Sequence, residues 1–336
     1  MSQLSPRPSS FLLALAFGLA CAPLTACGGG AEAGEERPEI AVVPKGTAHE
    51  FWKSVHAGAL HGAAGADVDV LWSGPEPEGD RDAQIKVVEN LALAGVDALV
   101  LMPVDAEALV PAARKLERKG IPVIVADSDL SWEGRTSFVA TDNRAAGRLA
   151  GEHLASLLGG EGEVILLRYV VGSASTQARE EGFLEAIQGH AGIQVVSSDQ
   201  YAGVSKADAQ SAAENLLARF PGVDGVFCPN ESAAFGMLRA LEDAREKNGL
   251  EGEVRFVGFD ASPNLLTGLE SGAIDALVLQ DPVRMGQLAV EVAAAALAGD
   301  EVEPRVDTGV TLATPANLNE PEIRALLEPD LSILDR

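Results

Sequence analysis

The chain has 336 residues, which is more than one ordinary domain holds and about right for two. Hydrophobic residues make up 47% of it, so each domain can bury a core of its own. The formal net charge of −25 excludes a nucleic-acid-binding surface, which needs a basic footprint, and argues against electrostatic docking on anionic lipid. A strongly acidic surface keeps a protein soluble, and we expect a monomer.

Residues 1–26 have the features of a lipoprotein signal peptide rather than of a folded element. Arg7 supplies a weak positive region, and residues 11–20 form an apolar stretch too short to span a bilayer. The sequence Leu-Thr-Ala-Cys at residues 24–27 resembles the lipobox of bacterial lipoproteins, in which the cysteine becomes the lipidated first residue. An ordinary signal peptide is the alternative, and its cleavage leaves Cys27 with a free thiol.

Residues 27–38 are rich in Gly, Ala, Glu and Pro, and they predict a flexible tether with almost nothing to bury. Of the three cysteines, Cys21 is removed with the leader and Cys27 carries the lipid. Cys228 is then alone, so no intrachain disulfide is available and stability must come from packing.

From residue 39 onward, short apolar runs alternate with longer amphipathic ones. The runs predict strands at residues 40–43, 68–72, 98–102, 123–126, 137–140, 164–168, 194–201, 225–228, 255–259 and 276–279. Helices are expected at residues 51–62, 80–94, 106–119, 144–158, 175–188, 205–220, 233–248 and 282–297, before an apolar run at 306–312 and a polar tail. Apolar strands separated by amphipathic helices predict an α/β fold of doubly wound parallel sheets.

Two stretches of the sequence are similar to each other. Residues 95–103, GVDALVLMP, resemble residues 222–229, GVDGVFCP. Each is followed by a helix and then by a strand that ends in an aspartate, Asp127 in the first case and Asp260 in the second. Two similar lobes built on one plan are the simplest explanation, and chance similarity of common strand–helix units is the alternative.

The sequence shows no residue set for catalysis. His49 and Glu50 begin a His-Glu-x-x-His metal pattern, but Lys53 stands at its fifth position. The chain also lacks a Gly-x-Ser-x-Gly elbow, a Gly-rich phosphate loop with Lys-Ser/Thr, and a Gly-x-Gly-x-x-Gly after a strand. We therefore expect no enzyme, no cofactor and no metal site.

Polar and aromatic residues gather where the expected strands end. In parallel sheets, ligands bind beyond the carboxyl ends of strands, where helix N-termini offer free N–H groups. Taken singly, the aspartates and Asn230 suit helix caps or turns, Arg179 suits a solvated helix face, and the aromatic residues suit the core. Because so many of these polar and aromatic residues fall at strand ends, we favour a ligand site there. The segments concerned are residues 45–52, 127–129, 179, 229–232, 260–263 and 279–282.

Together these residues resemble the sugar-binding branch of the periplasmic binding proteins, the ribose-binding type, whose fold is shared with the effector domains of lactose-repressor-like regulators. The resemblance extends from Ile40 to about Leu312, and its most specific parts are residues 138–143 (FVATDN), 226–231 (VFCPNE) with 236–241 (GMLRAL), and 257–260 (VGFD). It implies a hinge with three crossings. The first lobe is then residues 39–141 plus 281–308, and the second is residues 142–280 plus 309–336.

The resemblance also implies a role for particular side chains. An aromatic pair covers the faces of a sugar ring, a carboxylate accepts from its hydroxyls, an arginine donates to its oxygens, and further polar groups bind hydroxyls. Planar Asp, Asn, Gln and Arg groups suit this task because they bind neighbouring hydroxyls in pairs. The positions that match are Phe51 and Trp52, Asp127, Arg179, and Asn230, Asp260 and Gln280, with His49 included as a site residue.

Three positions depart from the family's pattern. His49 replaces an asparagine, Glu50 replaces a proline, and Ser128 stands where an arginine is usual, so the identity of the sugar is open. The resemblance implies a periplasmic or cell-envelope protein, lipid-anchored to a membrane, that binds a small sugar or polyol and delivers it to the membrane subunits of an ABC importer. The alternative is a sensory receptor subunit that presents its ligand to a membrane signalling protein.

Overall fold

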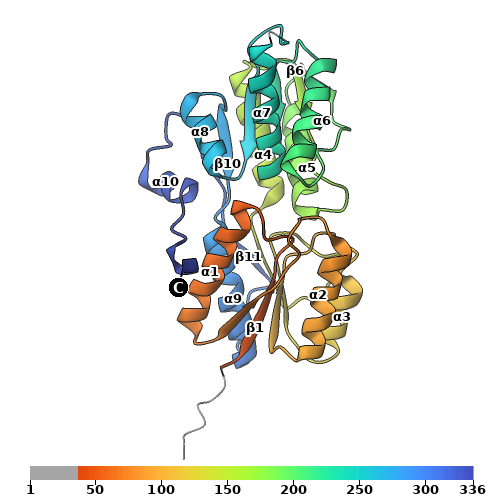
Figure 1. Cartoon of the computed structure of the whole chain (residues 1–336), viewed down its shortest axis with the longest axis vertical. Helices are drawn as coiled ribbons and strands as arrows, with labels where there is room; N and C mark the ends of the chain where they lie inside the picture. Colours follow the sequence, from red (N-terminus) through yellow and green to blue (C-terminus); the bar gives the residue numbers. More distant parts are fainter. Residues whose placement is uncertain (1–36, 248, 336) are drawn as a thin grey trace, which may run out of the picture. The chain divides into compact units, whose positions relative to one another are not determined.

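The computed structural model describes residues 37–247 and 249–335, which contain two six-stranded sheets (Figure 1). The first sheet has the order β11-β5-β4-β3-β1-β2, and its strands are all parallel. We call this sheet, with helices α1, α2, α3 and α9, the first lobe. Its strands are β1 (Glu39–Val43), β2 (Asp69–Trp72), β3 (Ala98–Leu101), β4 (Val123–Ala126), β5 (Ser137–Ala140) and β11 (Arg305–Asp307). Its helices are α1 (Glu50–Ala66), α2 (Arg81–Ala94), α3 (Val110–Glu117) and α9 (Pro282–Ala298).

The second sheet has the order β12-β10-β9-β8-β6-β7, with β12 antiparallel to β10 and the other pairs parallel. With helices α4 to α8 and α10 it forms the second lobe. Its strands are β6 (Glu161–Leu166), β7 (Gly192–Ser197), β8 (Gly225–Phe227), β9 (Arg255–Phe259), β10 (Ala276–Leu279) and β12 (Thr311–Ala313). Its helices are α4 (Asn143–Leu157), α5 (Ala174–Gln188), α6 (Lys206–Arg219), α7 (Glu231–Glu246), α8 (Pro263–Ser271) and α10 (Pro321–Leu327).

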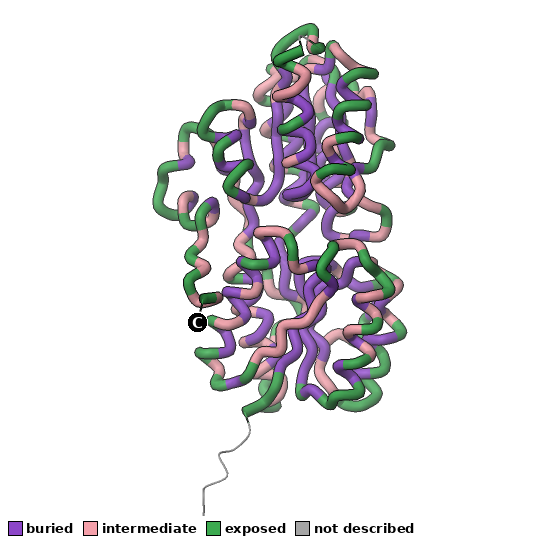
Figure 2. The backbone as a smooth tube through the Cα atoms, in the orientation of Figure 1, coloured by how far each residue is buried: buried purple, intermediate pink, exposed green. Residues whose placement is uncertain are grey.

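Both faces of each sheet are covered, because successive side chains of a strand point to opposite faces. In β1, Ile40 and Val42 pack with α1 and α9, while Ala41 and Val43 pack with α2 and α3. Figure 2 shows the consequence, with buried strands inside and exposed residues on the outer sides of the helices. The predicted class, two doubly wound parallel α/β sheets, is confirmed.

The apolar run expected at 306–312 forms two short strands in different sheets. β11 pairs with β5 and β12 pairs with β10, near the place where the family resemblance implied a crossing between the lobes. The break falls at Gly309, whose φ of 85° suits glycine. The chain thus passes between the sheets after β5, after β10, and between β11 and β12.

The expected polar tail contains two further elements, α10 and the short 3-10 helix η1 (Ser332–Asp335). Ile323 and Leu327, four residues apart on α10, enter the core of the second lobe. The residues of η1 instead contact α1 of the first lobe. The C-terminal segment, residues 314–335, therefore touches both lobes, with α10 beside α8 and the chain end beside α1 (Figure 1).

The predicted signal peptide and lipobox lie outside the described residues. Within residues 37–247 and 249–335, none of the helices combines the length and the apolar character needed to cross a bilayer. The same residues contain no cluster of His, Cys, Asp and Glu that is suited to a metal ion.

Candidate ligand-binding site

One cavity, which we call the cleft cavity, lies where the strand ends of the two lobes meet. Six of its lining residues come from the first lobe, six come from the second, and one follows β10 at a crossing between the sheets. All eight residues predicted from the sequence line it: His49, Phe51, Trp52, Asp127, Arg179, Asn230, Asp260 and Gln280. The structure brings the predicted set together, and the role of each side chain in binding a ligand stays a prediction.

Arg179 reaches the cleft cavity from α5, and a glycine on α4 sets its position. A Cβ atom at Gly147 would lie 1.9 Å from the backbone oxygen of Arg179, so only glycine lets the two helices approach this closely. The guanidinium is 2% exposed and lies 3.9 Å from the ring centre of Phe259. A solvated helix face, the alternative for Arg179, is excluded.

Two of the guanidinium's three nitrogens have partners. Nε donates to Asn143 Oδ1 at 2.7 Å, and Nη1 donates to the Pro229 carbonyl at 2.9 Å. Nη2 is buried and has no partner among the described residues. Burial lowers the pKa of Arg179, and nearby carboxylates, that of Asp260 first, oppose the shift. Arg179 therefore offers one unused nitrogen, with two N–H donors, to the cavity.

Asp127 follows β4 with a left-handed φ of 58°, and it caps no helix. Its Oδ2 lies 2.7 Å from Lys45 Nζ, and both side chains are 4% exposed. Lys45 Nζ also donates to Ser175 Oγ of the second lobe at 3.0 Å, and the Ser175 amide donates to Ser128 Oγ at 3.0 Å. Lys45 thus supplies a positive charge beside Asp127, although Ser128 stands where the family's pattern has an arginine.

Asp260 follows β9, also with a left-handed φ, 68°, and its carboxylate has two protein donors. The Glu231 amide donates to Oδ2 at 3.1 Å, and Gln280 Nε2 donates to Oδ1 at 2.7 Å. Burial raises the pKa of Asp260 to about 6, although Arg179 and the Gln280 hydrogen bond oppose the shift. Gln280 Oε1 is buried without a partner among the described residues, so it is an unused acceptor.

We expect Asp260→Asn to change the pH dependence of stability. The folded state holds the Asp260 proton more tightly than the unfolded state, so ionisation costs stability as the pH rises from 3.8 to about 6. The free energy of unfolding of the variant minus that of the wild type should therefore increase over this range and level off above pH 7, by on the order of 3 kcal/mol. Urea unfolding of both proteins without ligand, between pH 4 and pH 8, measures this difference, and a constant difference would contradict the raised pKa.

Asn230 both caps helix α7 and lines the cleft cavity. Its Oδ1 accepts from the Ala233 amide at 3.3 Å, which makes it the N-cap of α7, and its Nδ2 donates to Ser232 Oγ at 3.1 Å. The helix-cap alternative is thus correct for Asn230. It nevertheless lines the cleft cavity, so capping and contact with a ligand are compatible at this position.

His49, Trp52 and Glu78 form a buried cluster in the first lobe. Glu78 Oε2 lies 2.8 Å from His49 Nδ1 and accepts from Trp52 Nε1 at 3.0 Å. Burial disfavours both charges, but the His49–Glu78 contact outweighs it, so the pKa of Glu78 falls to about 2 and that of His49 rises. The ring centres of Phe51 and Trp52 are 4.9 Å apart and the ring planes meet at 87°. The two rings are therefore edge-to-face and do not form two parallel walls for a sugar ring.

Glu231 connects the two lobes. From α7 its Oε2 accepts from the Phe51 amide at the start of α1 at 3.3 Å, and Lys206 Nζ lies 2.9 Å from Oε1. The N-cap of α1, His49, makes no side-chain capping bond, so its first turn has free N–H groups. A carboxylate at a helix N-terminus is favourable, and Glu231 therefore caps a helix of the opposite lobe.

Sequence reasoning missed five residues that line the cleft cavity: Lys45, Glu78, Ser175, Thr176 and Glu231. Lys45 and Glu231 stood within the strand-end segments that pointed to the site, so the signal existed for them. Glu78 lies in the loop between β2 and α2, and Ser175 and Thr176 lie in the first turn of α5. No spacing in the sequence brings these three to the cavity.

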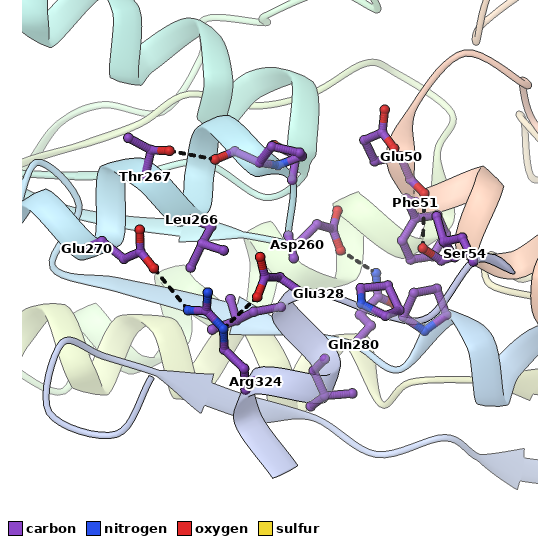
Figure 3. A pocket seen from close by; sticks show the side chains of 18 residues that line it. Glu50, Phe51, Ser54, Asp260, Leu266, Thr267, Glu270, Gln280, Arg324 and Glu328 are labelled. Atoms are coloured by element: carbon purple, nitrogen blue, oxygen red, sulfur yellow. Dashed lines mark hydrogen bonds and ion pairs between the residues drawn. The ribbon is translucent and has the colours of Figure 1, made fainter. Parts of the chain in front are cut away.

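A larger cavity, which we call the side chamber, adjoins the first (Figure 3). It has a volume of about 400 Å³, against about 30 Å³ for the cleft cavity. Its walls come from the start of α1, from α8, and from the C-terminal segment. Phe51, Asp260 and Gln280 line both cavities.

The fold and the site agree with the comparisons to known proteins. Residues 40–301 match the family described as a periplasmic binding protein domain. The D-ribose/D-allose-binding protein of Pseudomonas aeruginosa is 32% identical over 291 residues, which cover 83% of this chain and 89% of that protein.

Two solved structures are also similar to this chain. The carbohydrate transporter solute-binding protein of Agrobacterium radiobacter, in complex with D-arabinose, has a TM-score of 0.82 and 32% identity, covering 88% of this chain and 100% of that one. The ABC transporter solute-binding protein of Agrobacterium vitis, with bound D-fucose, has a TM-score of 0.81 and 33% identity, covering 86% and 100%. The chain belongs to the periplasmic binding protein family, as the sequence resemblance predicted. Its relatives are described as binding proteins rather than enzymes, and by its family this chain is a binding protein.

Proposed function

We propose that this chain is an extracytoplasmic, lipid-anchored solute-binding protein that encloses a small sugar or polyol between its lobes and delivers it to an ABC importer. The observation that carries the proposal is the convergence of eight predicted residues, from both lobes, on the cleft cavity. The relatives that bind D-ribose, D-allose, D-arabinose and D-fucose support a monosaccharide-sized polyhydroxylated ligand.

The unused polar atoms of the cleft cavity suit hydroxyl groups. Arg179 Nη2 is a donor without a partner and Gln280 Oε1 is an acceptor without one, and a hydroxyl group can serve both. The charged side chains nearby are largely paired with one another, as in Lys45–Asp127 and His49–Glu78. An uncharged polyol can use the unused donor and acceptor without breaking either pair.

We propose that the three crossings between the sheets act as a hinge and that the described structure represents the closed form. Direct contacts across the cleft support this assignment: the Ala106 amide donates to the Gly172 carbonyl at 2.9 Å, and Lys45 bonds Ser175. Ligand contacts to both lobes would favour closure over opening. The boundaries proposed for the lobes are those expected from the sequence.

A thermal-shift screen over pentoses, hexoses, polyols and nucleosides tests the proposed ligand class. A ligand at a hundredfold excess over its Kd stabilises the folded protein by about 2.7 kcal/mol, which gives an easily measured shift. We expect at least one monosaccharide or polyol to raise the melting temperature. If only nucleosides or charged metabolites do so, the sugar proposal is wrong.

Lipid anchoring has its own test. We expect Cys27→Ser to move the protein from the membrane fraction to the soluble fraction of its host cell, because a cysteine thiol is the acceptor in lipobox processing. Cys21→Ser is the matched control, since that residue would be removed with the leader. Membrane association that survives Cys27→Ser would refute the lipoprotein assignment.

A further inference from the structure

The side chamber is large enough for a chemical group of its own. Its volume of about 400 Å³ lies within the range of about 300–1,000 Å³ that is usual for small-molecule sites. The cleft cavity is much smaller, at about 30 Å³, so a sugar ring occupies it only when its lining side chains or the two lobes move apart. A ligand that enters the cleft therefore finds most of the adjoining space in the side chamber.

The two cavities share three lining residues. Asp260 and Gln280, joined by the 2.7 Å hydrogen bond, line both cavities together with Phe51 (Figure 3). Gln280 is 4% exposed, and its Oε1 has no partner among the described residues. An unsatisfied buried acceptor at this boundary favours a ligand hydroxyl, which can donate to it, close to the point where the cavities adjoin.

The inner wall of the side chamber is largely apolar. Leu266 of α8 and Leu327 of α10 line it and are 5% and 4% exposed, and Pro329 and Leu331 of the C-terminal segment line it as well. Such a wall favours an apolar group, at about 25 cal/mol for each Å² of apolar surface removed from water.

The side chamber is lined by four carboxylates and one arginine, and three of the carboxylates are paired with cations. Arg324 Nη1 lies 2.9 Å from Glu270 and Arg324 Nε lies 2.6 Å from Glu328, and all three side chains are more than one third exposed (Figure 3). Glu50 is paired with Lys53 at 2.8 Å. Because the one arginine of the chamber has two carboxylate partners, a phosphate or carboxylate group gains no free cation there. The chamber therefore disfavours an anion, and an uncharged substituent leaves its three ion pairs intact.

We propose that the ligand is a glycoside, whose sugar ring occupies the cleft cavity and whose uncharged, largely apolar aglycone occupies the side chamber. This inference rests on the proposed function, because it requires a sugar in the cleft. It adds that the chain distinguishes a free sugar from the same sugar with a substituent on its anomeric oxygen.

Matched pairs of ligands test the inference by isothermal titration calorimetry. The probes are D-glucose, D-galactose, D-xylose and D-arabinose, each compared with its phenyl α- and β-glycosides. We expect at least one phenyl glycoside to bind tenfold or more tightly than its own free sugar. Binding of the free sugars that is equal to or tighter than that of every glycoside would overturn the inference while leaving the proposed function intact. No binding by any sugar or glycoside would count against both.

Two tryptophan variants on α8 locate the subsite. Thr267 is exposed and lines the side chamber, so Thr267→Trp should fill the chamber and reduce the glycoside's advantage to less than twofold without weakening the free sugar. Asn264 is equally exposed on the same helix but does not line the chamber, so Asn264→Trp is the control. Equal effects of both variants, or of neither, would place the aglycone elsewhere and overturn the assignment.

Discussion

Replacing Arg179 by methionine is expected to lower the affinity for the ligand by at least about 100-fold. The side chain offers the one unused guanidinium nitrogen in the cleft cavity, and hydrogen bonds to a charged donor contribute about 1.5–3 kcal/mol each. Every 1.4 kcal/mol is a factor of ten in Kd, so two such bonds to a ligand account for the expected loss. Methionine keeps the apolar stem of the side chain and removes the donors.

The same variant should also lose stability without ligand. Asn143 Oδ1 and the Pro229 carbonyl would lose their partners, at a cost of about 1–3 kcal/mol for each buried group. Calorimetric titration well below the melting temperature separates the two effects, because it measures binding to folded protein. Arg245→Met, at an exposed position of α7, should change neither quantity. An unchanged Kd in Arg179→Met would show that the guanidinium is structural only.

Replacing Glu231 by alanine is expected to weaken every ligand by a similar factor, about tenfold or more. Glu231 caps α1 from the opposite lobe, and this contact exists only while the lobes are together. Losing it shifts the proposed equilibrium toward the open form, and the apparent affinity falls with the fraction of closed protein. A residue that acts in this way changes affinity without changing the ratio between two ligands.

Titration of two different ligands with wild type, Glu231→Ala and Glu231→Gln checks this expectation. Glutamine can still accept from the Phe51 amide but loses the charge attraction to Lys206, so its effect should be smaller. Glu246→Gln, at an exposed position of the same helix, is the control. A changed ratio between the two ligands would indicate that Glu231 touches the ligand itself rather than the opposite lobe.

The part of the site that could be predicted is the part that follows strand ends. Asp127 and Asp260 come directly after buried strands, and parallel strands bring their carboxyl ends to one edge, so the local sequence was sufficient. Glu78 has no such signal, because its loop reaches the cavity only through the packing of the first lobe. The pairing of Lys45 with Asp127 likewise depends on neighbouring strands, and no periodicity in the sequence encodes it.

The fold shows the same division between local and tertiary information. Every expected strand from β1 to β10 exists, because each contains a short run of apolar residues. The family resemblance placed a crossing within the apolar run at 306–312, but the residues of the run alone did not indicate it, because its division depends on which sheet edge each half meets. The C-terminal segment was described only as polar, although Ile323 and Leu327 carry the spacing of one buried helix face.

The C-terminal segment restricts how far the proposed opening can proceed. Leu327 is held in the second lobe and η1, beginning at Ser332, rests on α1, so only four residues of chain join the two attachments. Fully extended, five residue steps span about 17 Å. Lobe separation on this flank must stay within that reach or detach η1, and detachment returns the partly buried Ile333 and Leu334 to water. While η1 stays attached, it therefore limits how far the cleft can open and so the size of the molecule that can enter it.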